Sequence, residues 1–335
     1  MWERWKALAE EWDVKSLLAS LRVDFQSEGS NAKKVRGAAS ISGAAEGDIA
    51  FCWYSGEKGV SCITRSKASV ILCRNEMQGL VHPGADQLLI FTGNPRFAFV
   101  SVLNEMQGKE RRIGISRNAV ISKNAKIGKN CYIGDSAVIG DNCTVGDDTV
   151  IYDRVSLVQN CIVGRNCLIQ SGVSMGSDGF AFERYETGEL VKFPHRGYVR
   201  LGDNVEICAN CSIARGSLSE TVIGDGTKVD ALVHIAHNVI VGRNCELTAG
   251  TIIGGSTTLG DTCWTGLNST LKDNIRLGNN VIVASGASVI HDVPDGDIVA
   301  GVPAKSIKHK VNSDQLFLMA GQKEEQEKKK ISTAA

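Results

Sequence analysis

Three consecutive segments, Ala125-Lys-Ile-Gly-Lys-Asn, Cys131-Tyr-Ile-Gly-Asp-Ser and Ala137-Val-Ile-Gly-Asp-Asn, share one six-residue pattern. Each has a small residue, an aliphatic residue two positions later and a turn-forming end. Stepping by six, every position from Ile115 to Met175 is aliphatic or methionine, and a second run from Ile223 to Val289 has a single exception. An α-helix would need a period near 3.6 residues, so this period favours short strands separated by turns.

Repeats of this kind predict a left-handed parallel β-helix from about Ile113 to Val289. Two inward residues followed by a turn bend the chain steadily, so three hexads close one triangular coil and stacked coils share one aliphatic core. The small position of the repeat is often cysteine, so the eleven cysteines are interpreted mainly as buried residues in a reducing compartment. The repeat stops over 178–197 and shifts between Ile213 and Ile223, which predicts one long excursion and one short bulge.

The flanks of the repeats predict two further parts of a mainly β protein. Strand-like runs at 47–53, 68–73 and 87–91, with a helix over Pro95 to Met106, indicate a small α/β domain. With an amphipathic helix over Trp2 to Leu21, this domain is expected to occupy residues 1–110. The β-helix domain is expected over 111–305 and a short helical tail over 306–335.

The charge balance is neutral, because 37 Lys and Arg residues face 37 Asp and Glu residues. No overall field would therefore draw the chain onto nucleic acid or an anionic membrane. The sequence also lacks a run of the roughly 20 apolar residues that a membrane span needs. We expect a cytoplasmic protein with no transmembrane segment and no nucleic-acid partner.

Two of the six histidines fall in one hexad, Val233-His-Ile-Ala-His-Asn238, which marks a candidate site. Val233 and Ile235 point inward, so His234 lies on the outer face and His237 lies at a corner of the prism. One coil later, eighteen residues on, stands Gly255, which leaves room beside the imidazole and bares a backbone N–H. A base beside an oxyanion donor suits acyl transfer.

Other interpretations of this corner stay open at this point. A surface turn with no chemistry would also contain glycines, which are common in turns. A zinc site would need a further ligand, and His195, at the end of the excursion, is the nearest additional histidine, so no metal is expected. Asp230, one short strand before the hexad, is a candidate to polarise His237.

Several motifs along the repeats are shared with a known family. They are Ser177-Asp-Gly-Phe-Ala-Phe182, Lys192-Phe-Pro-His195, Arg215-Gly-Ser-Leu218, Thr221-Val-Ile-Gly224 and Ile235-Ala-His-Asn-Val239. With N-terminal elements such as Gly47-Asp-Ile-Ala-Phe51, they make most of the chain resemble the UDP-3-O-(3-hydroxyacyl)glucosamine N-acyltransferases of lipid A synthesis. The resemblance implies a homotrimer with sites between neighbouring prisms. It also implies an acyl donor on the phosphopantetheine of acyl carrier protein, an acceptor amine on a UDP-sugar, and no permanently bound cofactor.

The resemblance also implies roles for individual residues. His237 would be the general base and Gly255 the oxyanion donor. Substrate contacts are expected from Asn238, His234, Asp230, Asp178, Phe180, Phe51 and Asn274, and an acyl groove from Ser285, Gly286 and Ser288. The chain departs from the family in the uracil-binding segment, where Tyr54 replaces an Asn and Glu57 replaces an aromatic residue. It also departs in the repeats, where Asn274, roughly two coils after His237, replaces a second histidine.

Two alternatives accompany this hypothesis. The segment Gly301-Val-Pro-Ala-Lys305 is typical of coenzyme A-dependent hexapeptide acetyltransferases, so acetyl-CoA is an alternative donor for acylation of a nucleotide-linked amino sugar. The alternative from another class is a non-catalytic trimeric scaffold, because a fold alone does not determine a function.

Overall fold

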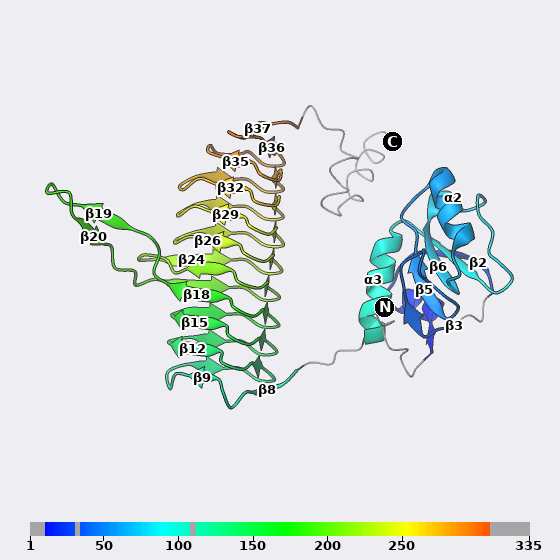
Figure 1. Cartoon of the computed structure of the whole chain (residues 1–335), viewed down its shortest axis with the longest axis horizontal. Helices are drawn as coiled ribbons and strands as arrows, with labels where there is room; N and C mark the ends of the chain where they lie inside the picture. The colour runs from blue at the N-terminus through cyan, green and yellow to red at the C-terminus, as the bar shows by residue number, and fades with distance from the viewer. Residues whose placement is uncertain (1–10, 31–33, 108–111, 309–335) are drawn as a thin grey trace. The chain divides into compact units, whose positions relative to one another are not determined.

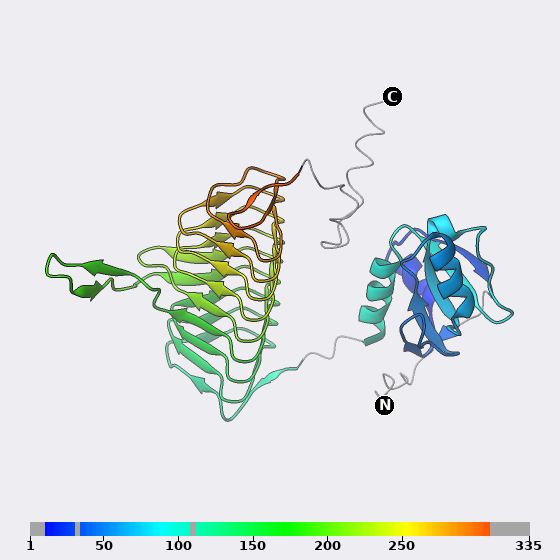
Figure 2. The same cartoon turned by 45° about the horizontal axis from the view of Figure 1, so that its top comes forward.

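The computed structural model describes residues 11–30, 34–107 and 112–308, and the chain divides into two compact units, Met1–Arg111 and Arg112–Ala335. Most of the predicted C-terminal helix and the first part of the predicted N-terminal helix lie outside the described residues. Figure 1 shows the second unit as a stack of coils from which one hairpin projects, and Figure 2 shows the same stack tilted.

The first unit is a small α/β domain around a five-stranded sheet of order β2-β7-β6-β5-β4. Strands β4 to β7 are parallel, and β2 is antiparallel to β7. The strands of the sheet are β2 (Gln26–Gly29), β4 (Gly37–Ala38), β5 (Asp48–Phe51), β6 (Val70–Arg74) and β7 (Leu88–Thr92). The helices are α1 (Val14–Ser20), α2 (Gly56–Arg65) and α3 (Pro95–Gln107), with a short 3-10 turn η1 (Asn75–Met77). The predicted strands and the predicted helix after Pro95 are therefore confirmed.

The N-terminal helix begins later than predicted. Trp12 and Asp13 form strand β1 (Trp12–Asp13), which pairs with β3 (Lys34–Val35). The Asp13 side chain accepts hydrogen bonds from the backbone N–H groups of Lys15 and Ser16. Because such an N-cap satisfies the first free donors of a helix, α1 begins at Val14.

The second unit is a prism of three parallel sheets whose strands follow one another in rotation. The eight-stranded sheet holds β10 (Lys126–Ile127), β13 (Thr144–Val145), β16 (Cys161–Val163), β21 (Tyr198–Leu201), β24 (Glu220–Ile223), β27 (Ile240–Val241), β30 (Thr258–Leu259) and β33 (Arg276–Leu277). The nine-stranded sheet holds β9 (Val120–Ile121), β12 (Val138–Asp141), β15 (Ser156–Gln159), β18 (Ser174–Ser177), β23 (Ser212–Ala214), β26 (His234–Ile235), β29 (Ile252–Ile253), β32 (Thr270–Leu271) and β35 (Ser288–Val289).

The third face of the prism is an eleven-stranded sheet. It holds β8 (Gly114–Ile115), β11 (Tyr132–Ile133), β14 (Val150–Ile151), β17 (Leu168–Ile169), β22 (Glu206–Ile207), β25 (Lys228–Val229), β28 (Glu246–Leu247), β31 (Trp264–Thr265), β34 (Ile282–Val283), β36 (Ile298–Ala300) and β37 (Lys305–Ser306). The last two strands are antiparallel and end the described stack.

The inward positions of the repeat form one continuous core, in which Ile133, Ile169 and Ile235 are fully buried. The first coil departs from the prediction, because Ile115 is 53% exposed. Its strand β8 pairs on one side only, with β11, so half of its packing partners are missing. Thr265, the one residue of the second run that is not aliphatic at the aliphatic position, is also buried, and its hydroxyl lies 3.0 Å from that of Thr251, which satisfies it inside the core.

One corner of the prism, which we call the glycine corner, follows the strands of the eight-stranded sheet. Every strand of this sheet is followed directly by glycine: Gly128, Gly146, Gly164, Gly202, Gly224, Gly242, Gly260 and Gly278. A Cβ on Gly242 would lie 2.5 Å from the carbonyl carbon of Gly260 in the next coil. Adjacent coils therefore approach most closely where side chains are absent.

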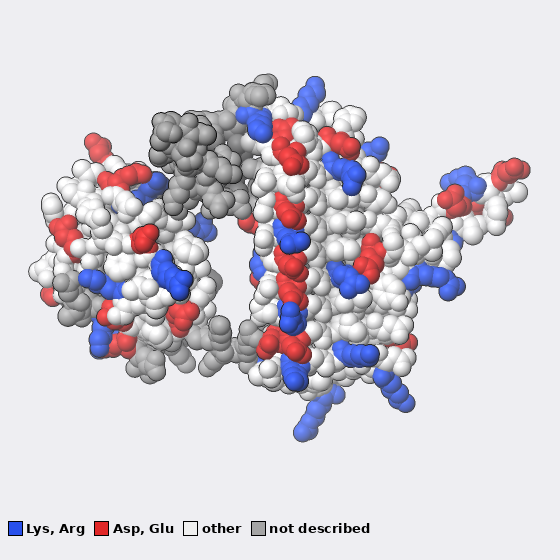
Figure 3. Space-filling model, turned by 180° about the vertical axis from the view of Figure 1, so that it is seen from behind, with Lys and Arg blue, Asp and Glu red and all other residues white. Residues whose placement is uncertain are grey.

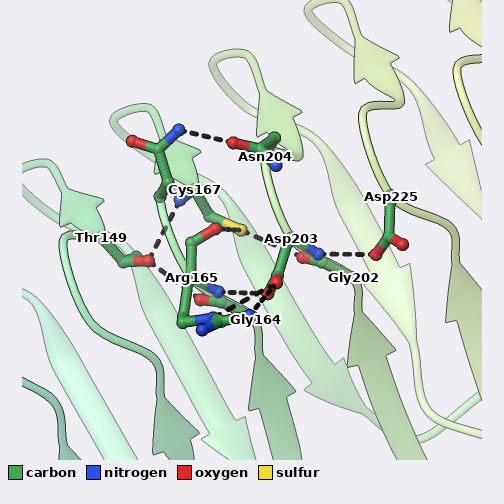
Figure 4. Close-up of polar contacts among 9 residues, drawn as sticks. Thr149, Gly164, Arg165, Cys167, Gly202, Asp203, Asn204 and Asp225 are labelled. Atoms are coloured by element: carbon green, nitrogen blue, oxygen red, sulfur yellow. Dashed lines mark hydrogen bonds and ion pairs between the residues drawn. The ribbon is translucent and has the colours of Figure 1, made fainter.

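The residue after each of these glycines helps join successive coils (Figure 4). The Arg165 N–H donates to the Asp203 carboxylate at 2.7 Å, and the Asp203 N–H donates to Asp225 at 2.8 Å. These carboxylates satisfy N–H groups at the corner.

Figure 3 shows charged residues of both signs mixed in a narrow band along the stack, so the face in that view has no broad patch of one sign.

The excursion predicted over 178–197 is an antiparallel hairpin of β19 (Phe182–Arg184) and β20 (Leu190–Lys192). The hairpin follows β18 and precedes β21 in the chain, and it projects from the stack (Figure 1). The predicted second bulge lies beside its base, because the N–H groups of Arg196 and Gly197 donate to the Ser217 carbonyl at 2.7 and 3.1 Å. The two breaks in the repeat therefore meet at one place on the prism.

Candidate active site

A pocket of about 380 Å³ lies at the corner between the nine-stranded and eight-stranded sheets, beside the base of the hairpin. It brings together six of the residues predicted from the sequence: Asp178, Phe180, His234, His237, Gly255 and Asn274. Strand β26 ends at Ile235, so His237 stands in the following turn, and His234 faces outward beside Ser212 and Ile252 of the adjacent strands.

The imidazole of His237 is held in one tautomer by Asn238. Its Nδ1 lies 2.9 Å from the Asn238 Oδ1, which also accepts from the backbone N–H of Ser217 at 3.1 Å. A backbone N–H only donates, so the Asn238 atom is an acceptor and Nδ1 must carry the proton. The other nitrogen, Nε2, therefore has its lone pair available to accept a proton.

Asn238 is itself fixed in place. Its backbone has φ of +61°, a left-handed conformation that Asn tolerates well. Its side-chain amide donates to the Ser219 hydroxyl at 2.8 Å, and its backbone N–H donates to the Thr221 hydroxyl at 2.9 Å. The coil below thus determines the orientation of the side chain that orients His237.

Two glycines border the imidazole of His237. A Cβ on Gly255 would lie 2.8 Å from Cε1 and 2.9 Å from Nε2 of His237, and a Cβ on Gly179 would lie 2.7 Å from Cδ2. The Ser256 N–H donates to the His237 carbonyl at 2.9 Å, which places the two turns one coil apart. The N–H of Gly255 makes no hydrogen bond within the described part of the chain, so it is available to a ligand.

Asp178 ties the hairpin to the prism beside the pocket. Its carboxylate pairs with Lys192 at 2.5 Å, at the end of β20, and with the buried guanidinium of Arg215. These two cations, Lys192 first, lower the pKa of the Asp178 carboxyl group. Beside it, Phe180 lines the pocket but remains 88% exposed. His234 is also open to solvent, although neighbouring atoms lower its pKa by desolvation.

Replacing Asp178 with Asn is expected to destabilise the base of the hairpin, because a neutral amide loses both ion pairs. The pKa of this carboxyl group is lowered in the folded state, so its contribution to stability is full above its ordinary value of 3.8 and is lost as the pH falls below that value. The unfolding temperatures of the wild type and the variant should differ less at about pH 3 than at neutral pH. Glu183→Gln on β19 is the control, and a difference that does not shrink in acid contradicts the prediction.

Several predicted site residues lie elsewhere. Asp230 does not polarise His237: its carboxylate accepts from the N–H groups of Ala231 at 2.7 Å and Ala249 at 3.1 Å, at a different corner of the prism. Phe51 lies in the first unit, where its ring packs on Phe99 with centroids 5.0 Å apart. Ser285, Gly286 and Ser288 do not line the pocket. Ser288 does share the outer face of the nine-stranded sheet with His234, through a register that continues by way of Ile252 and Thr270.

The site contains two residues that were not predicted from the sequence, Asp273 and His195. Asp273 lines the pocket and stands eighteen residues after Gly255, so counting one further coil would have found it. His195 packs against His237 with ring centroids 5.4 Å apart. No periodic signal places His195, because it returns from an excursion whose path the repeat does not determine.

The residues that the structure describes contain no group of three or more His, Cys, Asp or Glu side chains arranged to hold a metal ion. None of the helices in the described ranges is long and apolar enough to cross a membrane.

Known protein families match the repeats. The bacterial transferase hexapeptide family matches residues 118–152, 142–177 and 220–255, and the hexapeptide repeat of succinyl-transferase matches 256–290. The segment between residues 177 and 220, which neither family matches, contains the hairpin of β19 and β20. The solved structure of a UDP-N-acetylglucosamine acyltransferase from Campylobacter jejuni aligns with a TM-score of 0.52 at 20% identity, over 62% of this chain and 82% of that chain. With the three parallel sheets, these matches define the chain as a left-handed parallel β-helix protein built from hexapeptide repeats.

Curated relatives make the resemblance more specific. Proteins named UDP-3-O-acylglucosamine N-acyltransferase from Methylorubrum populi and Methylobacterium nodulans are each 42% identical to this chain over 140 residues. Each match covers 42% of this chain and 40% of the relative, so the chain matches two fifths of the relatives' length. The resemblance predicted from the sequence is confirmed over these residues, and outside them it stays a prediction.

Proposed function

We propose that this protein is an N-acyltransferase that moves a 3-hydroxyacyl group from a carrier thioester to the amine of a UDP-linked amino sugar, as in lipid A synthesis. The names of the curated relatives support this class of reaction. The observation that carries the proposal is the geometry of His237. Its Nδ1 is held by Asn238, and its Nε2 faces Gly255, a residue of the same pocket whose backbone N–H is free among the residues described.

The proposed reaction uses these groups directly. The amine attacks the thioester carbonyl while Nε2 of His237 accepts one of its protons. The N–H of Gly255 donates to the oxyanion of the tetrahedral intermediate, where a preorganised donor is worth most. When the intermediate collapses, the carbon–sulfur bond breaks, the thiolate takes the proton from His237, and an amide and a free thiol result. Asn238 stabilises the imidazolium through its oxygen atom.

The outer face of the nine-stranded sheet offers a path for the acyl chain. One coil above His234 stands Ile252, which is 46% exposed, then Thr270 and Ser288 follow in register. Strands are about 4.8 Å apart, so this path is about 14 Å long. We propose that the chain lies here, with Ser288, Ser285 and Gly286 near its far end.

Substrate recognition and assembly complete the proposal. The protein acts as a homotrimer in which a neighbouring prism closes the pocket, and it works in the cytoplasm, where its eleven free cysteines stay reduced. Uridine binds the first unit at Phe51. Support for that site comes from two exposed rings that follow it in the chain, those of Trp53 and Tyr54. The Arg74 guanidinium lies 5.3 Å from the centroid of the Trp53 ring, and the Lys58 ammonium lies 3.5 Å from the centroid of the Tyr54 ring.

The direct test is a donor survey read by mass spectrometry. The protein is incubated with a UDP-sugar that carries a 3-O-acyl chain and a free 2-amine, together with 3-hydroxyacyl carrier protein or acetyl-CoA. We expect an N-hydroxyacyl product with the carrier-protein donor. A product that is only N-acetylated would favour the acetyltransferase alternative, which is suggested by the segment Gly301–Lys305, from the end of β36 to the first residue of β37. Absence of thioester cleavage with both donors would favour the scaffold alternative.

A further inference from the structure

His195 is a buried imidazole that the proposed reaction does not use. It closes the excursion and is 3% exposed. Its Nδ1 lies 2.9 Å from the carbonyl oxygen of Phe193, which can only accept a hydrogen bond. The proton of a neutral His195 ring therefore sits on Nδ1, and Nε2 carries a lone pair.

The Nε2 atom of His195 is an unsatisfied acceptor directed at the active site. It is buried and has no hydrogen-bond partner among residues 11–30, 34–107 and 112–308. A Cβ built on Gly179 would lie 2.9 Å from this atom and 2.7 Å from Cδ2 of His237. Gly179 thus separates the two imidazoles without a side chain between them. Their rings meet edge to face, at 66°.

The fixed tautomer gives His195 an oriented dipole. In neutral imidazole the lone-pair nitrogen is the negative end and the N–H is the positive end. Here the positive end is directed at the Phe193 carbonyl, and the negative end is directed toward Gly179 and His237. A fixed negative end beside a site where positive charge develops lowers the energy of that charge.

We propose that His195 is a positioning residue that stabilises the imidazolium form of His237 as it takes the proton from the substrate. This inference rests on the proposed function. The ring of His195 also packs against that of His237, with centroids 5.4 Å apart, and so restricts the imidazole whose Nδ1 is held by Asn238. The hairpin is thereby coupled to the base, because His195 ends the excursion that Asp178 ties to the prism.

Other ionisable groups near His237 stay the same when His195 is replaced. On the excursion side these are Asp178 with its partners Lys192 and Arg215. On strand β26, which precedes His237, the side chain of His234 lines the same pocket, and Asp273 lines it from two coils above. A change in proton uptake by His237 on replacement of His195 alone therefore reports on the contact between the two rings.

The variant His195→Phe keeps a flat ring in the space but removes the lone pair and the dipole. We expect kcat to fall about tenfold with KM of both substrates within about twofold, because the loss appears only as charge develops. The acidic limb of the kcat/KM profile is expected to move to lower pH, by about half a unit, because the imidazolium is less stable. His291→Phe, outside the pocket, is the matched control and should change neither quantity.

A measurement without turnover separates this inference from the proposed function. In protein labelled with ¹⁵N-histidine, the His195 ring should show the Nδ1–H tautomer, and the midpoint of proton uptake by His237 should move to lower pH in His195→Phe. The His237 signal is assigned by its loss in His237→Ala. If the wild-type protein transfers no acyl group, the proposed function fails, and the labelled protein still tests the coupling. An Nε2–H tautomer, or an unmoved His237 midpoint, overturns the inference even if kcat falls.

Discussion

Replacement of His237 by alanine is expected to lower the rate of acyl transfer by about two to four orders of magnitude. The proton of the attacking amine would lose its acceptor, and the Nε2 lone pair that Asn238 orients would be gone. The N–H of Gly255 would remain, so residual activity above the uncatalysed reaction is expected. Steady-state kinetics with a 3-hydroxyacyl carrier protein as the donor give kcat and KM for both proteins. We expect the loss mainly in kcat, since the imidazole acts in the transition state.

The control for this variant is His291→Ala. His291 stands three coils after His237, at 54 residues' distance, and does not line the pocket. It should keep the wild-type rate. Size-exclusion chromatography must show the same assembly for all three proteins, so that a lost interface is not mistaken for lost chemistry. Near-normal turnover by His237→Ala, with the assembly intact, would rule out the general-base role.

Gly255→Ala is expected to lower kcat by about two to three orders of magnitude. The new methyl carbon would lie 2.8 Å from Cε1 and 2.9 Å from Nε2 of His237, closer than real Cβ contacts come. Either the imidazole moves off its bond to Asn238 or the turn moves and takes its N–H with it. Both outcomes separate the base from the oxyanion donor, and single-turnover rates with saturating substrates measure the effect.

A matched control tests whether any added methyl group has this effect. Gly84→Ala adds a Cβ whose nearest neighbour is 4.0 Å away, in a turn of the first unit, and should leave kcat unchanged. Thermal unfolding of both variants separates a local clash from a general loss of stability. A non-catalytic scaffold tolerates the change at Gly255, so full retention of acyl transfer in Gly255→Ala would contradict the oxyanion role.

The repeat allowed the architecture and part of the site to be predicted by counting. The step of eighteen residues placed Gly255 above His237, and one more step leads to Asp273, because coils between these positions have equal length. The alternation of inward and outward residues likewise put His234 on the outer face. Asp230 was misplaced because it belongs to the corner that precedes β26, where its carboxylate caps backbone N–H groups.

Counting fails where the chain leaves the repeat. The pairing of Asp178 with Lys192 and Arg215, and the contact of His195 with His237, depend on the path of the hairpin and on the bulge beside it. Those paths are set by side-chain contacts rather than by a period. The packing of Phe51 on Phe99 is similar, since sequence patterns identify a strand but not which ring its side chain meets.

The glycine corner has a consequence for how such a chain can diverge. At each of its eight glycines the backbone lies directly against the next coil. At Gly146, for example, an added Cβ would lie 2.6 Å from the Gly164 carbonyl. A larger residue at one of these positions would push two adjacent coils apart and tilt all the coils that follow. Substitutions should therefore accumulate at the outward-facing positions of the strands, while the glycine corner keeps its glycines. New specificities would then arise by changes of surface side chains on an unchanged β-helix.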